Sequence, residues 1–272
     1  MTQWFSEQQC MLTEEDLDAA SLQRVAGGVA GVYTHRAPGK ETANEDAAVT
    51  LALDGDQGLI AIADGAGGFR AGEVASRLAV EALSGAVVDA FAAGLPLRDA
   101  ILTGIENANQ NVLNLGIGAA TTLVAVEIQG RTIRTYHVGD SMALVVGQRG
   151  RIKLQTVSHS PVGYAVEAGV LDEGEALQHE ERHLVSNFIG TADMRVEIGS
   201  TLELARRDTV VIASDGLFDN LHIPEIAELV RCGPIQTVMH NVVAAARQRM
   251  LAADTALPSK PDDLTAIVYR LA

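Results

Sequence analysis

Carboxylate side chains stand at the ends of several apolar, strand-like runs in this sequence. The acids that share this setting are Asp46, Asp64, Asp140, Asp215, Asp262 and Asp263. A single Asp-Gly after a strand is usually only a turn. Five such strand ends in one chain, the last with two acids, favour a shared rim, where oxygen ligands suit a hard divalent cation such as Mg²⁺ or Mn²⁺. Gly65, directly after Asp64, would let the backbone approach a cation closely because it has no Cβ.

The elements that must position these acids follow from the apolar pattern. Strand-like runs occupy 28–34, 47–53, 59–63, 121–128, 132–138, 143–146, 152–156, 209–213 and 264–271. Apolar residues at helical spacing predict helices over 80–91, 97–115, 224–230 and 235–250. Strands, two helices, more strands, further helices and a last strand predict an α+β fold, in which helices pack outside antiparallel sheets.

The domain organisation is simple. Residues 1–27 are polar and acidic, and Thr13 is a candidate helix N-cap, so we expect an N-terminal extension or a first helix there, without chemistry. Residues 28–272 contain no internal repeat and no low-complexity linker, which predicts a single domain.

Composition narrows the class of protein. The 272 residues are 47% hydrophobic and carry 20 Lys+Arg against 35 Asp+Glu, a formal net charge of −15. The hydrophobic fraction argues against a disordered chain. The net negative charge argues against nucleic acid or an anionic membrane surface as a partner. The sequence has no apolar run of the roughly 18 to 20 residues that a membrane span needs, and no signal-peptide pattern. We expect a cytoplasmic monomer with two reduced cysteines.

Six short motifs carry a family resemblance. They are Asn-Glu-Asp at 44–46, Asp-Gly-Ala-Gly-Gly at 64–68, Gly-Ala-Ala-Thr-Thr-Leu at 118–123, Val-Gly-Asp-Ser at 138–141, Ser-Asp-Gly-Leu-Phe-Asp at 214–219 and Asp-Asp-Leu-Thr at 262–265. In this order and at these separations, the chain from about residue 31 onward resembles the PPM/PP2C family of metal-dependent protein serine/threonine phosphatases, in its compact bacterial form.

The resemblance implies a fold and a metal centre. The fold is an α-β-β-α sandwich, two antiparallel sheets flanked by helices, with a binuclear site for Mn²⁺ or Mg²⁺ at one end. The implied catalytic carboxylates, which hold the two ions, are Asp46, Asp64, Asp215 and Asp262. Asp64 would bridge the ions, the Gly65 carbonyl would be a further ligand, and Glu45 would act through metal-bound water. An optional third ion would lie among Asp140, Asp215 and Asp219.

The resemblance also implies an activity. A hydroxide that bridges the two ions would attack the phosphorus of phosphoserine or phosphothreonine in a protein, with no phosphoenzyme intermediate. A phosphorylated protein is then the substrate, and the cognate kinase is a separate chain. Because crowded carboxylates repel one another, we expect the metal-free protein to be destabilised and bound metal to raise its melting temperature.

The chain departs from the family pattern at several positions. Many members have an arginine that binds phosphate at the place of Glu41, so we expect Lys40 or Arg36 to supply that cation, Lys40 as a point charge. Ala66 stands where some members, but not the bacterial relatives, have a His general acid. Asp263 stands where Asn is usual, and Ser158 stands where relatives often have Asp. The segment from about 158 to 190 is the expected flap, which influences substrate choice.

Two other functions remain open alternatives. The absence of an arginine at position 41 favours a catalytically weak module that binds phosphoproteins, whereas the intact acids argue against it. His179-Glu180-x-x-His183 matches the zinc-peptidase motif, provided that a helix places both histidines on one face. We interpret His137 and His159 as hydrogen-bonded structural histidines.

Overall fold

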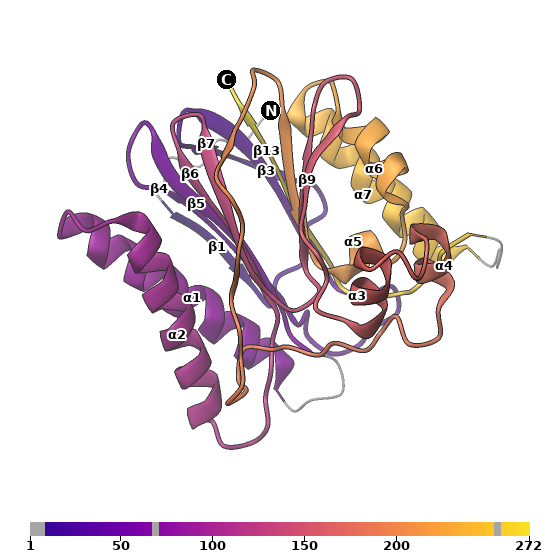
Figure 1. The fold of residues 1–272 in the computed structure, drawn as a ribbon, viewed down its shortest axis with the longest axis horizontal. Helices are drawn as coiled ribbons and strands as arrows, with labels where there is room; N and C mark the ends of the chain where they lie inside the picture. Colours follow the sequence, from indigo (N-terminus) through magenta and orange to yellow (C-terminus); the bar gives the residue numbers. More distant parts are fainter. Residues whose placement is uncertain (1–8, 67–70, 253–256) are drawn as a thin grey trace.

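Two antiparallel sheets packed face to face form the centre of the molecule, and helices cover both outer faces (Figure 1). The computed structural model describes residues 9–66, 71–252 and 257–272. The observed architecture confirms the predicted α+β fold with flanking helices.

The seven-stranded sheet takes its strands from the N-terminal half and from the segment after the flap. In spatial order it contains β1 (Gln9–Thr13), β4 (Asp46–Ala52), β5 (Gln57–Asp64), β6 (Leu123–Gln129), β7 (Thr132–Val138) and β10 (Glu197–Ile198), with β11 (Leu202–Glu203) also paired to β7. Helices α1 (Gly72–Ala92) and α2 (Leu97–Asn114) pack on its outer face.

The six-stranded sheet takes its strands from more distant parts of the chain. Its order is β2 (Ser21–Val25), β3 (Gly28–His35), β13 (Leu264–Leu271), β12 (Thr209–Ala213), β8 (Met142–Val146) and β9 (Ile152–Gln155). Its outer face is covered by α5 (Asp215–Phe218), α6 (Ile223–Val230) and α7 (Ile235–Leu251). None of the helices in the described residues has both the length and the apolar character that a membrane crossing requires.

The helix alternative for residues 1–27 is wrong where the structure describes them. Residues 9–13 form β1, which pairs with β4, and residues 21–25 form β2, which pairs with β3. Each strand adds to the edge of a different sheet, so residues 9–25 are part of the sandwich and not an extension of it. Residues 1–8 lie outside the described residues.

The strand β5 illustrates why the sequence builds two packed layers. Because successive side chains on a strand point to opposite faces, Ile60 and Ile62 enter the core between the sheets, whereas Leu59, Ala61 and Ala63 pack against α1 and α2. A strand that is buried on both faces has an uninterrupted run of apolar residues. In β5 this run ends at Asp64.

The flap contains two short helices that the apolar pattern does not reveal. Ser160 caps α3 (Pro161–Glu167) by accepting a hydrogen bond from the Gly163 backbone at 2.9 Å. Asp172 and Glu175 form a reciprocal capping box at the start of α4 (Glu173–Gln178). Both helices are seven residues or shorter, so their caps define them better than any periodicity.

Candidate metal centre

Strand register brings the predicted acids to one edge of the sandwich. Asp46, the first residue of β4, lies directly opposite Asp64, the last residue of β5. In the other sheet, β12 ends and β13 begins at the same edge, since Ala213 pairs with Ala266. The Ser214 hydroxyl connects the two sheets there by donating to Asp46 Oδ2 at 2.9 Å. We call the acids at this edge the carboxylate rim: Asp46, Asp64, Asp140, Asp215, Asp219 and Asp262.

Asp46 has the environment of a cation ligand. It is almost fully buried, and its Oδ1 has no hydrogen-bond partner. Burial raises the pKa of Asp46 well above its usual range, and the nearby Asp263 charge adds to the effect. The pKa of Asp64 is raised in the same way, first by burial and then by Asp46 and Asp215. An unpaired buried carboxylate oxygen is costly unless a cation or donor compensates it, so these residues fit a divalent ion.

The backbone around Gly65 leaves no room for a side chain. A Cβ at Gly65 would come within 2.4 Å of the Gly72 backbone and 2.8 Å of the Glu45 carbonyl oxygen. The Gly65 amide donates to that carbonyl at 3.0 Å, which ties Glu45 to the end of β5. A Cβ at Gly72 would lie 2.7 Å from Glu45 Oε1. Both glycines therefore permit Glu45 and Asp64 to share one compact turn.

The remaining rim acids gather beside the flap. Asp215 and Asp219 lie on and just after α5, Asp140 follows β7, and Asp262 precedes β13. Burial, together with the charges of Asp215 and Asp219, raises the pKa of Asp140 to about 8. Burial and the Asp215 charge raise the pKa of Asp262 to about 6. Mutual repulsion at this density favours a bound cation.

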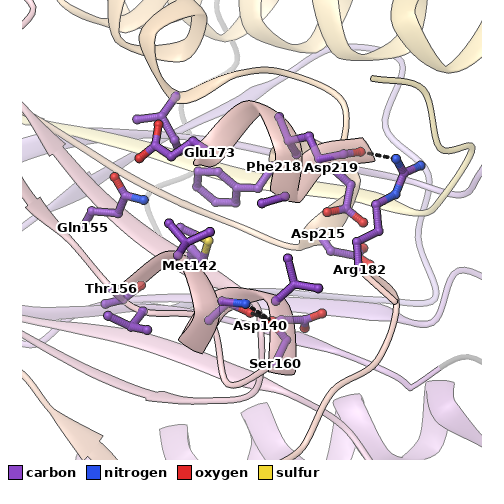
Figure 2. A pocket seen from close by; sticks show the side chains of 18 of the residues that line it. Asp140, Met142, Gln155, Thr156, Ser160, Glu173, Arg182, Asp215, Phe218 and Asp219 are labelled. Atoms are coloured by element: carbon purple, nitrogen blue, oxygen red, sulfur yellow. Dashed lines mark hydrogen bonds between the residues drawn. The ribbon is translucent and has the colours of Figure 1, made fainter. Parts of the chain in front are cut away.

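A cavity of about 330 Å³ opens onto this part of the rim. Its polar end carries Asp140, Asp215 and Asp219, and Arg182 approaches them from the flap (Figure 2). Its other lining is largely apolar, with Met142 and Phe218 among the contributing residues. The cavity thus joins the acids to the flap, the segment expected to influence substrate choice.

Two candidate phosphate-binding cations have different surroundings. Lys40 Nζ donates to Glu45 Oε2 and to Asp263 Oδ2, both at 2.6 Å, so it lies next to the predicted metal ligands. Arg36 is instead paired with Asp16, whose carboxylate accepts from both its backbone amide and its Nε at 2.6 Å. Of the two, Lys40 is the cation that contacts the site.

Asp263, which replaces the usual asparagine, organises the loop before β4. Its carboxylate accepts from the Ala37 amide at 2.8 Å, the Glu45 amide at 2.7 Å and Lys40. The Lys40 ammonium balances the buried charge, and its own pKa is raised by Asp263 and Glu45 against the opposing effect of burial. Asp263 therefore positions both Glu45 and Lys40.

His137 and His159 form a stacked pair, with ring centroids 4.4 Å apart, close to Glu197. His159 Nδ1 accepts from the Gly139 amide at 3.1 Å and from the Asn187 side chain at 2.8 Å. Its proton must then lie on Nε2, which faces Glu197 Oε2 at 3.3 Å. A protonated nitrogen is not a metal ligand, so these bonds favour the structural interpretation over a second metal site.

The zinc-peptidase alternative lacks the helix it requires. Helix α4 ends at Gln178, and residues 179–183 form a turn in which His183 is exposed. The two histidines therefore do not lie one helical turn apart on a common face, and that prediction is wrong.

The comparison with known families agrees with this geometry. Residues 34–254 match the family described as Protein phosphatase 2C. This chain belongs to the protein phosphatase 2C family. The match covers the loop before the rim, the whole flap and α5 to α7. It confirms the predicted family and enzyme class, a protein serine/threonine phosphatase.

Individual relatives give the same assignment. The protein phosphatase PhpP of Streptococcus pneumoniae is 31% identical over 198 residues, which are 70% of this chain and 80% of PhpP. The serine/threonine phosphatase of S. agalactiae has a structure with a TM-score of 0.74 at 28% identity, covering 89% of this chain and 99% of that one. The catalytic domain of PstP, solved with two manganese ions, has the same fold at 24% identity and a TM-score of 0.68, covering 89% and 96%.

Sequence reasoning missed one prominent residue of the site. Lys260 Nζ contacts the carboxylates of Asp215, Asp219 and Asp262, the last two at 3.1 Å. Its only sequence signal is its place two residues before Asp262. Ser214 belongs to the motif at 214–219, but its hydrogen bond to Asp46 is identified only by the structure.

Proposed function

We propose that this phosphatase hydrolyses phosphoserine and phosphothreonine in proteins with two divalent cations held by Asp46, Asp64, Asp215 and Asp262. The observation that carries the proposal is the facing pair Asp46 and Asp64, with an unpaired buried oxygen on Asp46. Glu45 and the Gly65 backbone complete the proposed ligand set, and their fixed turn supports that role.

The proposed ions are Mn²⁺ or Mg²⁺, because the donor set consists of oxygens alone. The two manganese ions of PstP support this choice. When bound, such a pair of cations lowers the pKa of water and offsets the charge of the phosphoryl oxygens.

The chain's own residues supply binding and orientation. Lys40 remains an ammonium at neutral pH, because its pKa is raised, and we assign it to a phosphoryl oxygen of the substrate. That oxygen would replace one of the two carboxylates that Lys40 now contacts. Glu45, held by the Asp263 carboxylate through its amide, orients the attacking water. Ala66 offers no acid to the leaving group, so solvent water protonates the departing serine or threonine oxygen.

The cellular context follows from the same activity. The substrate is a phosphorylated protein, and we assign its phosphorylation to a separate kinase. A monomer in the cytoplasm remains the prediction from sequence. The cavity under the flap, where Met142 and Phe218 lie beside Asp140, is the region that we assign to substrate contact.

One observation favours a second candidate, a weak phosphoprotein-binding module. Glu41 is exposed and offers no cation where many family members have an arginine. Steady-state hydrolysis of a phosphothreonine peptide with MnCl2 distinguishes the two. Turnover that disappears with EDTA and in Asp215→Asn, but persists in the exposed control Asp56→Asn, supports the enzyme. Peptide binding without turnover would support the module.

A further inference from the structure

Lys260 occupies the side of the carboxylate rim that the family resemblance assigns to a third ion. Its ammonium contacts Asp215 and, at 3.1 Å, Asp219, two of the three acids implied for that ion. It also contacts Asp262 at 3.1 Å. The Lys260 side chain is only 22% exposed, so the ammonium has exchanged most of its water for these carboxylates.

Hydrogen bonds fix the backbone of Lys260 independently of its charge. Its amide donates to Asn220 Oδ1 at 2.8 Å, and Asn220 Nδ2 donates to the Lys260 carbonyl oxygen at 2.8 Å. The same Nδ2 donates to the Gly216 carbonyl in α5 at 2.9 Å, and Asn220 is fully buried. The loop before β13 is thereby fastened to the helix that carries Asp215, which delivers Lys260 to the rim.

On the flap side of the cavity that opens onto the rim, Ser158 stands where the family resemblance places an aspartate. Ser158, which lines the cavity with Asp140, Asp215 and Asp219, donates its hydroxyl to Ser160 Oγ at 2.9 Å. A hydroxyl so engaged is a poor substitute for a carboxylate as a ligand of a hard cation. Beside Asp215 and Asp219 the structure therefore places the Ser158 hydroxyl and the Lys260 ammonium.

We propose that Lys260 replaces the third metal ion, so that this phosphatase binds two divalent cations and excludes a third. The inference rests on the proposed two-ion site. Lys260 Nζ contacts one oxygen, Oδ2, of each of Asp215, Asp219 and Asp262. The two proposed ions also have Asp46 and Asp64, with which Lys260 forms no ion pair within the described residues. A third ion would instead depend on Asp215 and Asp219 for two of its three acids, so the ammonium would repel it at short range. Removing the ammonium, with the acids left in place, should create the missing site.

Isothermal titration with MnCl2 and elemental analysis of the dialysed protein test this directly. The wild type should bind two Mn²⁺, and Lys260→Met should bind three, with at least tenfold tighter binding of the third ion than the wild type. Lys260→Arg, which keeps the charge, should bind two. Lys153→Met is the matched control, since Lys153 pairs with Asp208 at 2.6 Å, and it should also bind two.

Several results would overturn the proposal. If the wild type binds three ions, the proposal is wrong. This measurement needs no variant, so the test stays valid even if Lys260→Met fails to fold. The proposal is also wrong if a folded Lys260→Met binds only two ions. A raised KM in that variant would then identify Lys260 as a substrate ligand. Asp64→Asn separates the two proposals: if it loses ions while the wild type binds three, the two-ion site stands and only the role of Lys260 is wrong. No ion in the wild type would contradict both.

Discussion

The two lysines of the site, Lys40 and Lys260, pair with different acids and differ in what surrounds those partners. The main partner of Lys40 is Asp263, whose carboxylate also accepts from the Ala37 and Glu45 amides. The partners of Lys260 have fewer other donors, and Asp219 Oδ2 has no hydrogen bond despite its ion pair.

This difference separates two roles for a cation beside a metal centre. Lys40 belongs to a loop that is held by backbone hydrogen bonds, so it can leave a carboxylate for a phosphate without loss of the loop. Lys260 instead compensates three closely spaced, partly buried acids. The first lysine should affect substrate binding, and the second should affect the number of ions.

Substitution of a proposed metal ligand should have a larger effect than substitution of either lysine. Asp64→Asn removes the charge of the proposed bridging ligand, and the loss of transition-state stabilisation by metal is several kcal/mol, about 10³-fold in kcat. Steady-state kinetics on a phosphothreonine peptide with MnCl2 check this, with Asp56→Asn as the control. Activity within tenfold of the wild type would remove Asp64 from the catalytic centre.

Bound metal should change stability by a smaller amount. At a Mn²⁺ concentration 100 times Kd, one site stabilises the folded state by about 2.7 kcal/mol, a rise in Tm of roughly 5 to 10 °C for a chain of this size. Differential scanning calorimetry with MnCl2 and with EDTA measures the difference. No rise in Tm would contradict the proposed site.

The pH dependence of the metal-free protein follows from the raised pKa values. The folded pKa of Asp140 is about 8 and that of Asp262 about 6, against 3.8 for an ordinary Asp. Between these values the folded state holds more protons than the unfolded state, so its stability falls as pH rises from about 4 to about 8. The Tm in EDTA should fall over this range, less steeply in Asp140→Asn. A Tm that rises toward pH 8 in EDTA would contradict the buried, repelling rim.

Lys40 should act on substrate binding. Lys40→Ala removes a charge-assisted hydrogen bond, which is worth about 1.5 to 3 kcal/mol, so KM for the phosphopeptide should rise about tenfold or more. Lys40→Arg should retain most of the affinity, and the number of bound Mn²⁺ ions should remain two. An unchanged KM in Lys40→Ala would end its assignment as the phosphate-binding cation.

The smallest effect should come from the partner of Lys40. Asp263→Asn keeps an acceptor for only one of the two amides, because Ala37 donates to Oδ1 and Glu45 to Oδ2, and it removes the charge that holds Lys40. Because Lys40 and Glu45 keep their own functional groups, KM should change by less than about tenfold. The same kinetic assay measures it. A loss as large as that of Asp64→Asn would make Asp263 part of the metal centre.

Apolar runs made much of the fold predictable from sequence. The bounds of β12 and β13 match the prediction, because a buried strand is continuous and apolar. The strand β1 was missed because Gln9–Thr13 is short and mixed, and its partner β4 is distant in sequence. Whether such a short segment forms a strand depends on its pairing with a distant strand, and not on its local sequence pattern.

The acids of the site were predictable from sequence because they follow or precede the apolar runs that form the strands. Asp46, Asp64 and Asp215 stand at strand ends, and the family motifs name them, so their convergence could be expected. The place of Lys260 could not, because it depends on the side chain of Asn220, 40 residues away. The choice between Lys40 and Arg36 also needed the structure, because Asp16, which pairs with Arg36, is 20 residues away.

A crystal structure of the protein grown with MnCl2, with an anomalous difference map at the manganese edge, tests the central claim most directly. Two peaks are expected at the rim, between Asp46, Asp64, Asp215 and Asp262, and no third peak is expected among Asp140, Asp215 and Asp219. A map without peaks at the rim, or with its strongest peak beside His137 and His159, would contradict it.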